Sequence, residues 1–270
     1  MFGNVAVIEF KKHSHRLCFL LLSIFYNHSL ASVQSAIVFE PQVAFFDYQE
    51  TGRQGESLNT EGGQLLGGRS ALQFEFNDFS TELSAQQLSG QVAYQGKTQT
   101  GNQHSTKTYN KIFRSELVFG YRFHLPFKIE PRIGLQYYSW YRGIRAKNSV
   151  SSLTEVYRGK VLKPSVRLYS VQNYIELGLT RTFNNSMKIQ ATQCLSSVTV
   201  YPKADTAWFV TGYKHLFEKK HYSSYISLSI EQYRMKESDV EPGQTCFGPV
   251  GWSEPDNWMR LIQFGLGFRF

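Results

Sequence analysis

Charged side chains recur at alternate positions in the middle of this 270-residue chain. Between residues 111 and 142, one side of the pattern carries Arg114, Glu116, Arg122, Glu130 and Arg132. A spacing of two residues places such side chains on one face of extended strands. Acids and bases held together in a narrow, poorly hydrated space must form ion pairs, because an unpaired buried charge costs several kcal/mol. We therefore predict an internal charge network of Glu75, Arg114, Glu116, Arg122, Glu130, Arg132, Glu176 and Glu231.

Side chains that could support hydrolysis are scattered along the chain. His104 and Ser105 are neighbours in a polar stretch, where an extended backbone points them in opposite directions. Hydrolysis requires a base within hydrogen-bond reach of a nucleophile or a water. Further candidates fall in separate loop-like or turn-like segments, with no close Asp/His pairing: Asp205, Asp239, Glu241, Asp256, His124, His215 and His221. The sequence therefore predicts no catalytic residues and a protein that is not an enzyme.

Metal and cofactor binding have no signature in the sequence. No stretch shows the Cys/His spacing of a zinc site. Cys194 and Cys246 follow the N-terminal region, one in a predicted strand and the other in a loop, and they could form a disulfide in an oxidising compartment. We expect no metal and no cofactor.

The faces opposite the charges are apolar and aromatic. Residues 111–124 place Phe113, Leu117, Phe119, Tyr121 and Phe123 on one side. Residues 128–142 repeat the pattern after a short LPF turn. Two antiparallel strands joined by such a turn put charge on one side of a sheet and hydrocarbon on the other.

Composition favours a membrane barrel built from strands of this kind. Hydrophobic residues make up 41% of the chain and aromatic residues 15%, and no apolar run of about 20 residues follows the N-terminus. A barrel hides its apolar surface by alternation, so low average hydropathy is expected. A soluble β-sandwich has similar statistics. Aromatic residues near the strand ends, and long polar loops alternating with turns such as LPFK, FNNS and FEKK, favour the barrel.

We predict an all-β fold, a single antiparallel transmembrane β-barrel of ten strands with five long outer loops and four short turns. Residues 157–169 are interrupted by Pro164 and four cations, and we assign them to an extension above the membrane. Omitting them gives the even strand number that a barrel with both termini on one side requires. Residues 51–68 and 97–109 are predicted loops. The alternative is eight strands with extended surface hairpins. The ten predicted strands cover residues 37–49, 69–79, 84–96, 111–124, 128–142, 170–183, 186–200, 205–217, 221–235 and 256–270.

The N-terminus has the pattern of a signal peptide. Basic residues from Lys11 to Arg16 precede a short apolar run from Leu17 to Tyr26, and small residues follow up to Ala31. We predict a signal peptide at 1–31 and a barrel at 32–270. Removing the signal peptide takes away three cations and one anion, which lowers the net charge from +8 to +6. This excess is spread out, so the sequence lacks the basic cluster of a nucleic-acid-binding protein.

The final strand resembles a known assembly element. Residues 257–270, NWMRLIQFGLGFRF, alternate apolar side chains and end on Phe270. This pattern resembles the C-terminal assembly signal of Gram-negative outer-membrane β-barrels, with Phe264, Leu266, Phe268 and Phe270 as its residues. Together with EGGQLLGG and QVAYQG, it resembles small, uncharacterised outer-membrane barrel proteins.

This resemblance implies a protein of the cell outer membrane that is inserted by the barrel-assembly machinery and surrounded by membrane lipid and lipopolysaccharide. We expect a non-enzymatic barrel with surface-exposed loops and a largely filled, salt-bridged lumen. The alternatives are a narrow channel for small polar solutes and, less favoured, an outer-membrane hydrolase that resembles omptin proteases or lipid A-modifying enzymes.

Overall fold

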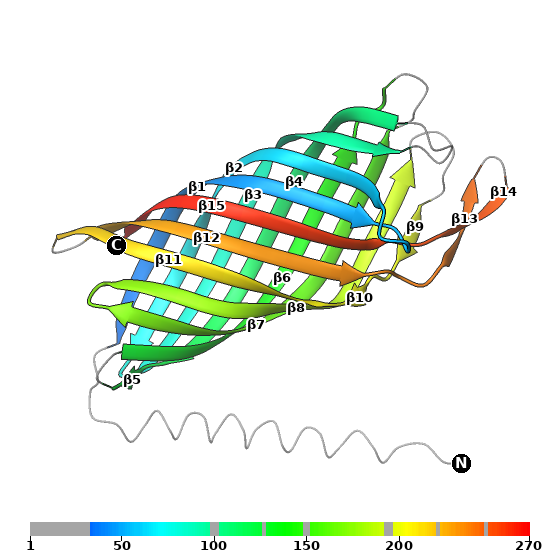
Figure 1. Cartoon of the computed structure of the whole chain (residues 1–270). Coiled ribbons are helices and arrows are strands. Elements are labelled where there is room, and N and C mark those ends of the chain that lie inside the picture. The colour runs from blue at the N-terminus through cyan, green and yellow to red at the C-terminus, as the bar shows by residue number, and fades with distance from the viewer. Residues whose placement is uncertain are drawn as a thin grey trace, which may run out of the picture.

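The structure is a computed structural model that describes residues 33–97, 103–125, 128–147, 152–191, 197–219, 222–245 and 248–270. Within these ranges the regular elements are strands, and they close into one antiparallel barrel (Figure 1). Among the same residues, no helix is long and apolar enough to cross a membrane. The predicted signal peptide, Cys194 and Cys246 lie outside the described residues.

Ten long strands form the barrel wall, and each pairs with the next in sequence. β15 pairs with both β12 and β1, which closes the sheet, so that Phe264 lies between Leu228 and Val43. The predicted count of ten is confirmed. The wall strands are β1 (Gln34–Thr51), β2 (Ser57–Phe76), β3 (Phe79–Lys97), β4 (Gln103–Tyr121), β6 (Lys128–Ile144), β7 (Leu153–Ser170), β8 (Asn173–Ala191), β11 (Thr206–Lys219), β12 (Tyr222–Lys236) and β15 (Asp256–Arg269).

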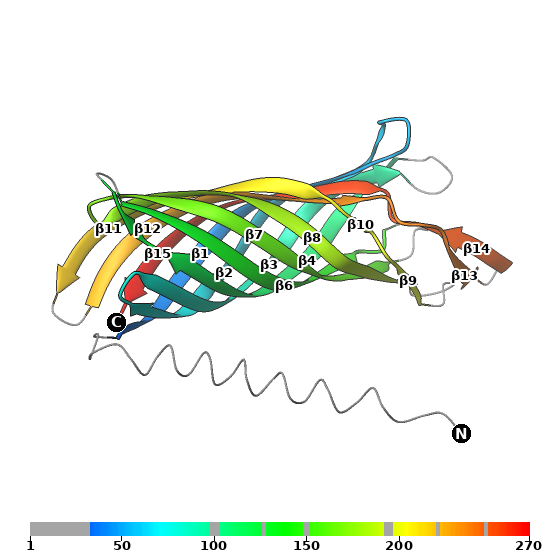
Figure 2. The ribbon, with the colours of Figure 1, turned by 90° about the horizontal axis from the view of Figure 1, so that it is seen from below.

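Shorter strands extend the two ends of the wall. β5 (Phe123–His124) pairs with β6, β9 (Val198–Val200) with β8, and β10 (Lys203–Ala204) with β12. β13 (Glu241–Thr245) and β14 (Gly248–Trp252) form a separate hairpin that projects beyond the barrel (Figure 2). Five connections lie at this outer end and four turns at the other, as predicted. The backbones of Ile37 and Phe270 exchange hydrogen bonds, so both ends of the described wall lie beside the four turns.

Two strand assignments from the sequence were wrong. One strand was omitted and one was counted in excess, so the total of ten strands is unaffected. Residues 157–169 lie within β7, which pairs with β6 and β8 along its length. Residues 186–200 are not an independent strand, because their first part ends β8 and Val198–Val200 pairs back on it as β9. The expected FNNS turn lies inside β8, where Asn184 has φ 51°, and the real turn is Val171–Gln172. Pro164 is compatible with β7 because it faces outward and no partner on β8 is recorded for it among the described residues.

The predicted loop at 51–68 was also wrong, since most of it belongs to β2. Its glycines allow close strand contact. A Cβ atom on Gly67 would lie 1.8 Å from the backbone oxygen of Gln87 on β3. Glycine at this position therefore permits the close approach of β2 and β3.

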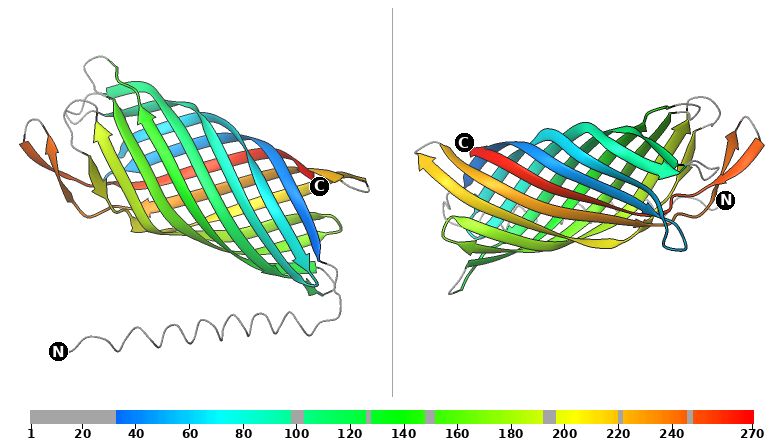
Figure 3. Two further views of the ribbon diagram at one scale, coloured as in Figure 1. Left: turned by 180° about the vertical axis from the view of Figure 1, so that it is seen from behind. Right: turned by 45° about the horizontal axis from the view of Figure 1, so that its top comes forward.

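Apolar side chains cover the outside of the wall. Leu66 is 62% exposed and Phe119 51% exposed, although both belong to long strands that are paired on both sides. A soluble sandwich would bury these residues between its sheets. A continuous exposed belt of this kind fits a lipid bilayer, and the barrel views in Figure 3 show the wall that carries it. Large apolar residues of the belt include Phe39, Val43, Phe45, Leu72, Leu83, Leu117, Ile133, Leu135, Leu162, Ile175, Leu177, Ile226, Leu228, Phe264 and Leu266.

Aromatic residues mark the edges of the belt. Phe79, Tyr121 and Phe123 contact one another near the turns, with ring centroids 4.9 and 4.8 Å apart. Tyr109 and Tyr141 contact at 6.2 Å on the opposite edge. Aromatic side chains are favoured at both membrane–water interfaces. The belt therefore has an aromatic edge beside the four turns and another beside the five connections. In the orientation expected from the sequence, the end with the four turns, where both ends of the described wall lie, is the periplasmic end.

Candidate functional site: the barrel lumen

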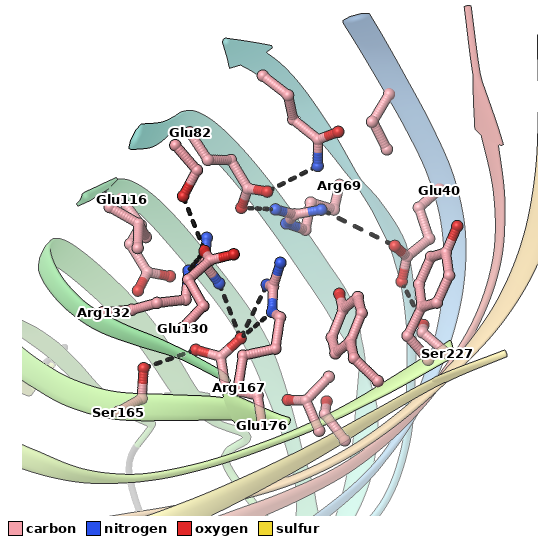
Figure 4. A pocket seen from close by; sticks show the side chains of 18 of the residues that line it. Glu40, Arg69, Glu82, Glu116, Glu130, Arg132, Ser165, Arg167, Glu176 and Ser227 are labelled. Carbon is pink, nitrogen blue, oxygen red and sulfur yellow. Dashed lines mark hydrogen bonds and ion pairs between the residues drawn. The ribbon is translucent and has the colours of Figure 1, made fainter. Parts of the chain in front are cut away.

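The inner, periplasmic half of the lumen is lined by ion pairs (Figure 4). Glu176 accepts hydrogen bonds from Arg132 at 2.7 Å, Arg167 at 2.8 Å and Ser165 at 2.7 Å. Glu130 is fully buried and lies 3.2 Å from Arg132. These residues come from β6, β7 and β8, whose inward positions alternate with the apolar belt.

The structure places all eight residues predicted for the charge network on the lumen side and joins them through ion pairs. Arg114 pairs with Glu231 at 2.7 Å, and Lys163 lies 3.3 Å from both Glu231 and Glu116. Arg122 lies 3.3 Å from Glu75 and 3.4 Å from Glu130. Opposite charges this close in a poorly hydrated space offset part of the desolvation cost that each would carry alone.

Five further members of the network were missed by the sequence analysis: Glu40, Arg69, Glu82, Lys163 and Arg167. Arg69 pairs with Glu82 and lies 3.9 Å from Glu40, which also accepts hydrogen bonds from Tyr225 and Ser227. Lys163 and Arg167 were missed because residues 157–169 were assigned outside the barrel. Glu40 alternates with outward apolar residues in β1, a signal that could have identified it.

A polar cavity of about 240 Å³ lies inside this network. Its lining includes Glu75, Arg122, Gln172 and Arg269 at the periplasmic mouth. The rings of Tyr174 and Tyr213 stack at 4.7 Å near this mouth, and Tyr225 lies 4.4 Å from Tyr213. The cavity has room and partners for ordered water.

The outer half of the lumen is filled by an apolar and aromatic cluster, which we call the outer core. Trp140 stacks on Tyr157 with centroids 4.5 Å apart, and the rings of Phe46 and Tyr48 meet Trp140 edge-on. Leu65, Leu88, Ile112, Val161 and Leu261 complete its centre, each with at most 1% of its surface exposed. Side chains therefore close the lumen above the polar cavity.

A second charged cluster, the outer charge cluster, lies above the outer core. Arg142 is completely buried and reaches Glu155 at 2.5 Å, Glu61 at 2.6 Å and Glu50 at 2.8 Å. Its guanidinium also lies 4.6 Å from the ring centroid of Tyr48. Three carboxylates around one cation leave an excess of negative charge. Hydrogen bonds donated by Tyr48, Asn110 and Tyr157 stabilise these carboxylates.

Glu254, which lies in the connection between β14 and β15, packs against this cluster. Tyr157 donates a hydrogen bond to its carboxyl at 2.9 Å, and Asn257 donates another at 2.5 Å. Burial, followed by the nearby Glu50 and Glu155, raises the pKa of the Glu254 carboxyl well above its usual range. Glu254 therefore holds the connection against the barrel mouth through these hydrogen bonds.

The remaining predicted positions do not form a reactive site in the described part of the chain. Asp239 pairs with Lys203 at 2.7 Å, and Asp256 accepts a hydrogen bond from the Glu237 backbone. His104 packs beside Tyr94, while His124 pairs with Asp78 at 2.8 Å at the periplasmic end. No group of three or more His, Cys, Asp or Glu side chains among the described residues could hold a metal ion. His221 lies outside the described residues.

The residues predicted as the assembly signal lie on or directly after β15. Phe264 and Leu266 point outward into the belt, and Phe270 is 63% exposed at the chain end. Phe268 lies opposite Phe39 of β1. The strand that carries them also closes the barrel, so its outward face is part of the apolar belt.

Comparisons with known proteins support the fold. No protein-family model matches the chain, and no curated protein matches its sequence. The outer membrane protease OmpT from Escherichia coli is similar in structure, with 8% identity and a TM-score of 0.55, over 88% of this chain and 96% of OmpT. The Pseudomonas putida toluene transporter TodX matches with 6% identity and a TM-score of 0.37, over 90% of each chain. The similarity to OmpT, together with the closed antiparallel sheet, shows the fold of a Gram-negative outer-membrane β-barrel, and the exposed apolar belt fits that membrane.

Proposed function

We propose that this protein is a non-enzymatic, non-conducting outer-membrane barrel that presents its outer connections to ligands or partners at the cell surface. The outer core carries the proposal. Trp140, Tyr157 and their neighbours occupy the lumen at the level where a pore would need water. Solute passage through this level would require several fully buried side chains to leave their packing.

The charge network supports the same function. A conducting lumen exposes charged groups that ions can contact, whereas here each predicted network residue is held by an opposite charge within 4.0 Å. The polar cavity reaches the periplasmic mouth, and the outer core lies between it and the outside. A narrow channel for small polar solutes remains the alternative that the experiment below addresses.

The acids of the outer end support a structural role rather than hydrolysis. Glu50, Glu61 and Glu155 are engaged by Arg142 and are buried, so they are not positioned to activate a water on an external substrate. The similarity to OmpT is one of fold at 8% identity. A catalytic role depends on the residues of a site and does not follow from a shared fold.

The partners we propose follow from the apolar belt and the barrel architecture. Membrane lipid contacts the belt, lipopolysaccharide surrounds its outer edge, and the barrel-assembly machinery inserts the chain. The hairpin β13–β14 projects beyond the wall and offers an exposed surface for a partner, with Val240 59% exposed beside it. Nucleic acid is not among the partners we propose.

Planar-bilayer recording of the purified protein tests the closed lumen. We expect no steady conductance from the unmodified barrel. The double variant Trp140→Ala/Tyr157→Ala, which empties the centre of the outer core, should show intermittent or steady conductance. Tyr137→Ala/Tyr141→Ala, which truncates outward-facing rings, is the matched control and should stay closed. A steady current through the unmodified protein that changes in Arg122→Ala would instead establish the narrow channel.

A further inference from the structure

Cations line the outer edge of the apolar belt on one side of the barrel. On three strands, the first outward side chain beyond an aliphatic or phenylalanine residue of the belt is a lysine or an arginine. On β4 and β8 an aromatic residue, Tyr109 or Phe183, is the next outward side chain. Arg158 lies one outward position beyond the cation on β7. The pairs of belt residue and cation are Phe113 and Lys111 on β4, Leu162 and Lys160 on β7, and Leu179 and Arg181 on β8.

The strand register brings three of these cations together. Lys160 lies opposite Phe183, two residues from Arg181 on the same face of β8. Such diagonal neighbours are about 7–8 Å apart, and Arg158 lies about 6.6 Å along the strand from Lys160. Lys111 lies opposite Tyr141 of β6, two strands away from Lys160. One anionic group can therefore contact two or three cations at once.

These charges have no acidic partner within the wall. The outward faces of β4, β6, β7 and β8 carry no aspartate or glutamate among the described residues. None of the four cations lies within 4.0 Å of a carboxylate in the part of the chain that the structure describes. On the opposite wall, by contrast, the outward-facing Arg260 pairs with Asp47 at 2.6 Å. The four cations are therefore not neutralised by carboxylates of the described wall.

The position of this row of four cations along the barrel axis indicates which layer of the membrane they face. Tyr109, Tyr137 and Tyr141 lie on the same stretch of wall, where aromatic rings occupy the interface between hydrocarbon and head groups. This edge is the one far from the periplasmic turns, so the row faces the head groups of the outer leaflet. In a Gram-negative outer membrane, the abundant anions at that depth are the phosphates of lipopolysaccharide.

We propose that Lys111, Arg158, Lys160 and Arg181 form a binding site for the phosphate groups of lipopolysaccharide on the lipid-facing wall. The site deepens the proposed function, which names lipopolysaccharide as a partner, and it rests on that proposal. Because the site lies outside the lumen, it does not depend on whether the lumen is closed. Lysine and arginine bind phosphate through charge-assisted hydrogen bonds, and arginine can do so with two parallel bonds. The apolar belt directly below the row receives the acyl chains of the same molecule.

The test compares two double variants that remove the same charges from different walls. Lys160→Gln/Arg181→Gln removes one lysine and one arginine from the site. Arg234→Gln/Lys236→Gln removes the same pair from outward positions of β12. Each protein is purified in detergent and titrated with lipopolysaccharide that carries its lipid A phosphates, with dephosphorylated lipopolysaccharide and with phosphatidylglycerol. Heat-modifiable gel mobility shows that each variant retains the barrel.

We expect the site variant to bind phosphorylated lipopolysaccharide about 30-fold more weakly than the unmodified protein, which corresponds to about 2 kcal/mol. The β12 variant should bind within about threefold of the unmodified protein. The charge-preserving exchange Lys160→Arg/Arg181→Lys should retain most of the affinity, which separates charge from a packing effect. Equal affinities for the two Gln variants would overturn the proposal. So would equal binding of dephosphorylated lipopolysaccharide, or binding of phosphatidylglycerol as tight as that of lipopolysaccharide.

Discussion

Removing the cation of the outer charge cluster should destabilise the barrel strongly. In Arg142→Met the apolar part of the side chain is kept, while Glu50, Glu61 and Glu155 lose their shared partner. Arg142 has no exposed surface, so water cannot replace it without rearrangement. Breaking a buried ion pair by removing one partner costs about 3–5 kcal/mol, and loss of the contact with the Tyr48 ring adds to that cost. We therefore expect the free energy of unfolding to fall by about 3–5 kcal/mol.

The assay is urea-dependent unfolding of the protein in lipid vesicles, followed by tryptophan fluorescence and by heat-modifiable gel mobility. Arg158→Met is the matched control, because Arg158 faces outward on β7 and should tolerate the same substitution within about 0.5 kcal/mol. A second variant combines Arg142→Met with Glu50→Gln, Glu61→Gln and Glu155→Gln. Neutralising the whole cluster should recover most of the lost stability, since replacing complete buried ion pairs is often neutral.

Two results would refute this reasoning. The first is that Arg142→Met unfolds at the same urea concentration as Arg158→Met, which would mean that the buried arginine does not compensate the three carboxylates. The second is that the variant with four substitutions is no more stable than Arg142→Met, which would assign the loss to packing rather than to uncompensated charge.

Three further predictions follow from the lumen and the wall. The raised pKa of Glu254 means that docking of its connection is fully favourable below the ordinary carboxyl pKa of 4.5 and weakens as pH rises from there toward the raised pKa. Limited proteolysis should show that the 237–255 connection opens as pH rises in the unmodified protein and much less in Glu254→Gln. Identical pH profiles for the two proteins would contradict this. Gly67→Ala should impair barrel assembly, because the added Cβ meets the Gln87 backbone oxygen, while Gly62→Ala, whose Cβ has its nearest neighbour at 3.6 Å, should assemble normally in the same gel-mobility assay. Glu176→Gln weakens the ion pairs with Arg132 and Arg167 and should lower the free energy of unfolding by about 1.5–3 kcal/mol. Glu218 is exposed, so Glu218→Gln should change the free energy of unfolding little. Equal urea midpoints for these two variants would argue against a stabilising network.

Alternation in the sequence was sufficient to predict the barrel and the inward position of eight charged residues. The count of ten also needed the even-number rule, and two of the strand assignments behind it were wrong. The period of two is local, so Arg122 and Glu130 could be assigned to one face without knowing their partners. The pairing itself depends on strand register around a closed sheet, which is not visible locally. Glu231 and Arg114 are 117 positions apart yet lie 2.7 Å from each other.

The errors in the sequence analysis share a physical cause. Pro164 and the surrounding cations were interpreted as interruptions, although Lys163 and Arg167 point inward while Arg158 and Lys160 point outward. The glycines of β2 were interpreted as loop residues, although Gly67 is required where two strands approach closely. The outer core was not predicted, because Phe46 and Leu65 look like ordinary apolar strand residues until the closed wall brings them together.

Cysteine accessibility tests most directly whether the periplasmic half of the lumen contains water and the outer half is closed by packed side chains. In a background with Cys194→Ser and Cys246→Ser, Ser229→Cys places a thiol on the lining of the polar cavity, and Val161→Cys places one in the outer core. Each protein, folded in vesicles, is treated with a small charged thiol reagent. The closed lumen predicts rapid labelling at position 229 and no labelling at position 161 until the barrel is unfolded. Equal labelling rates at the two positions in the folded barrel would contradict a filled outer half and favour a continuous aqueous channel.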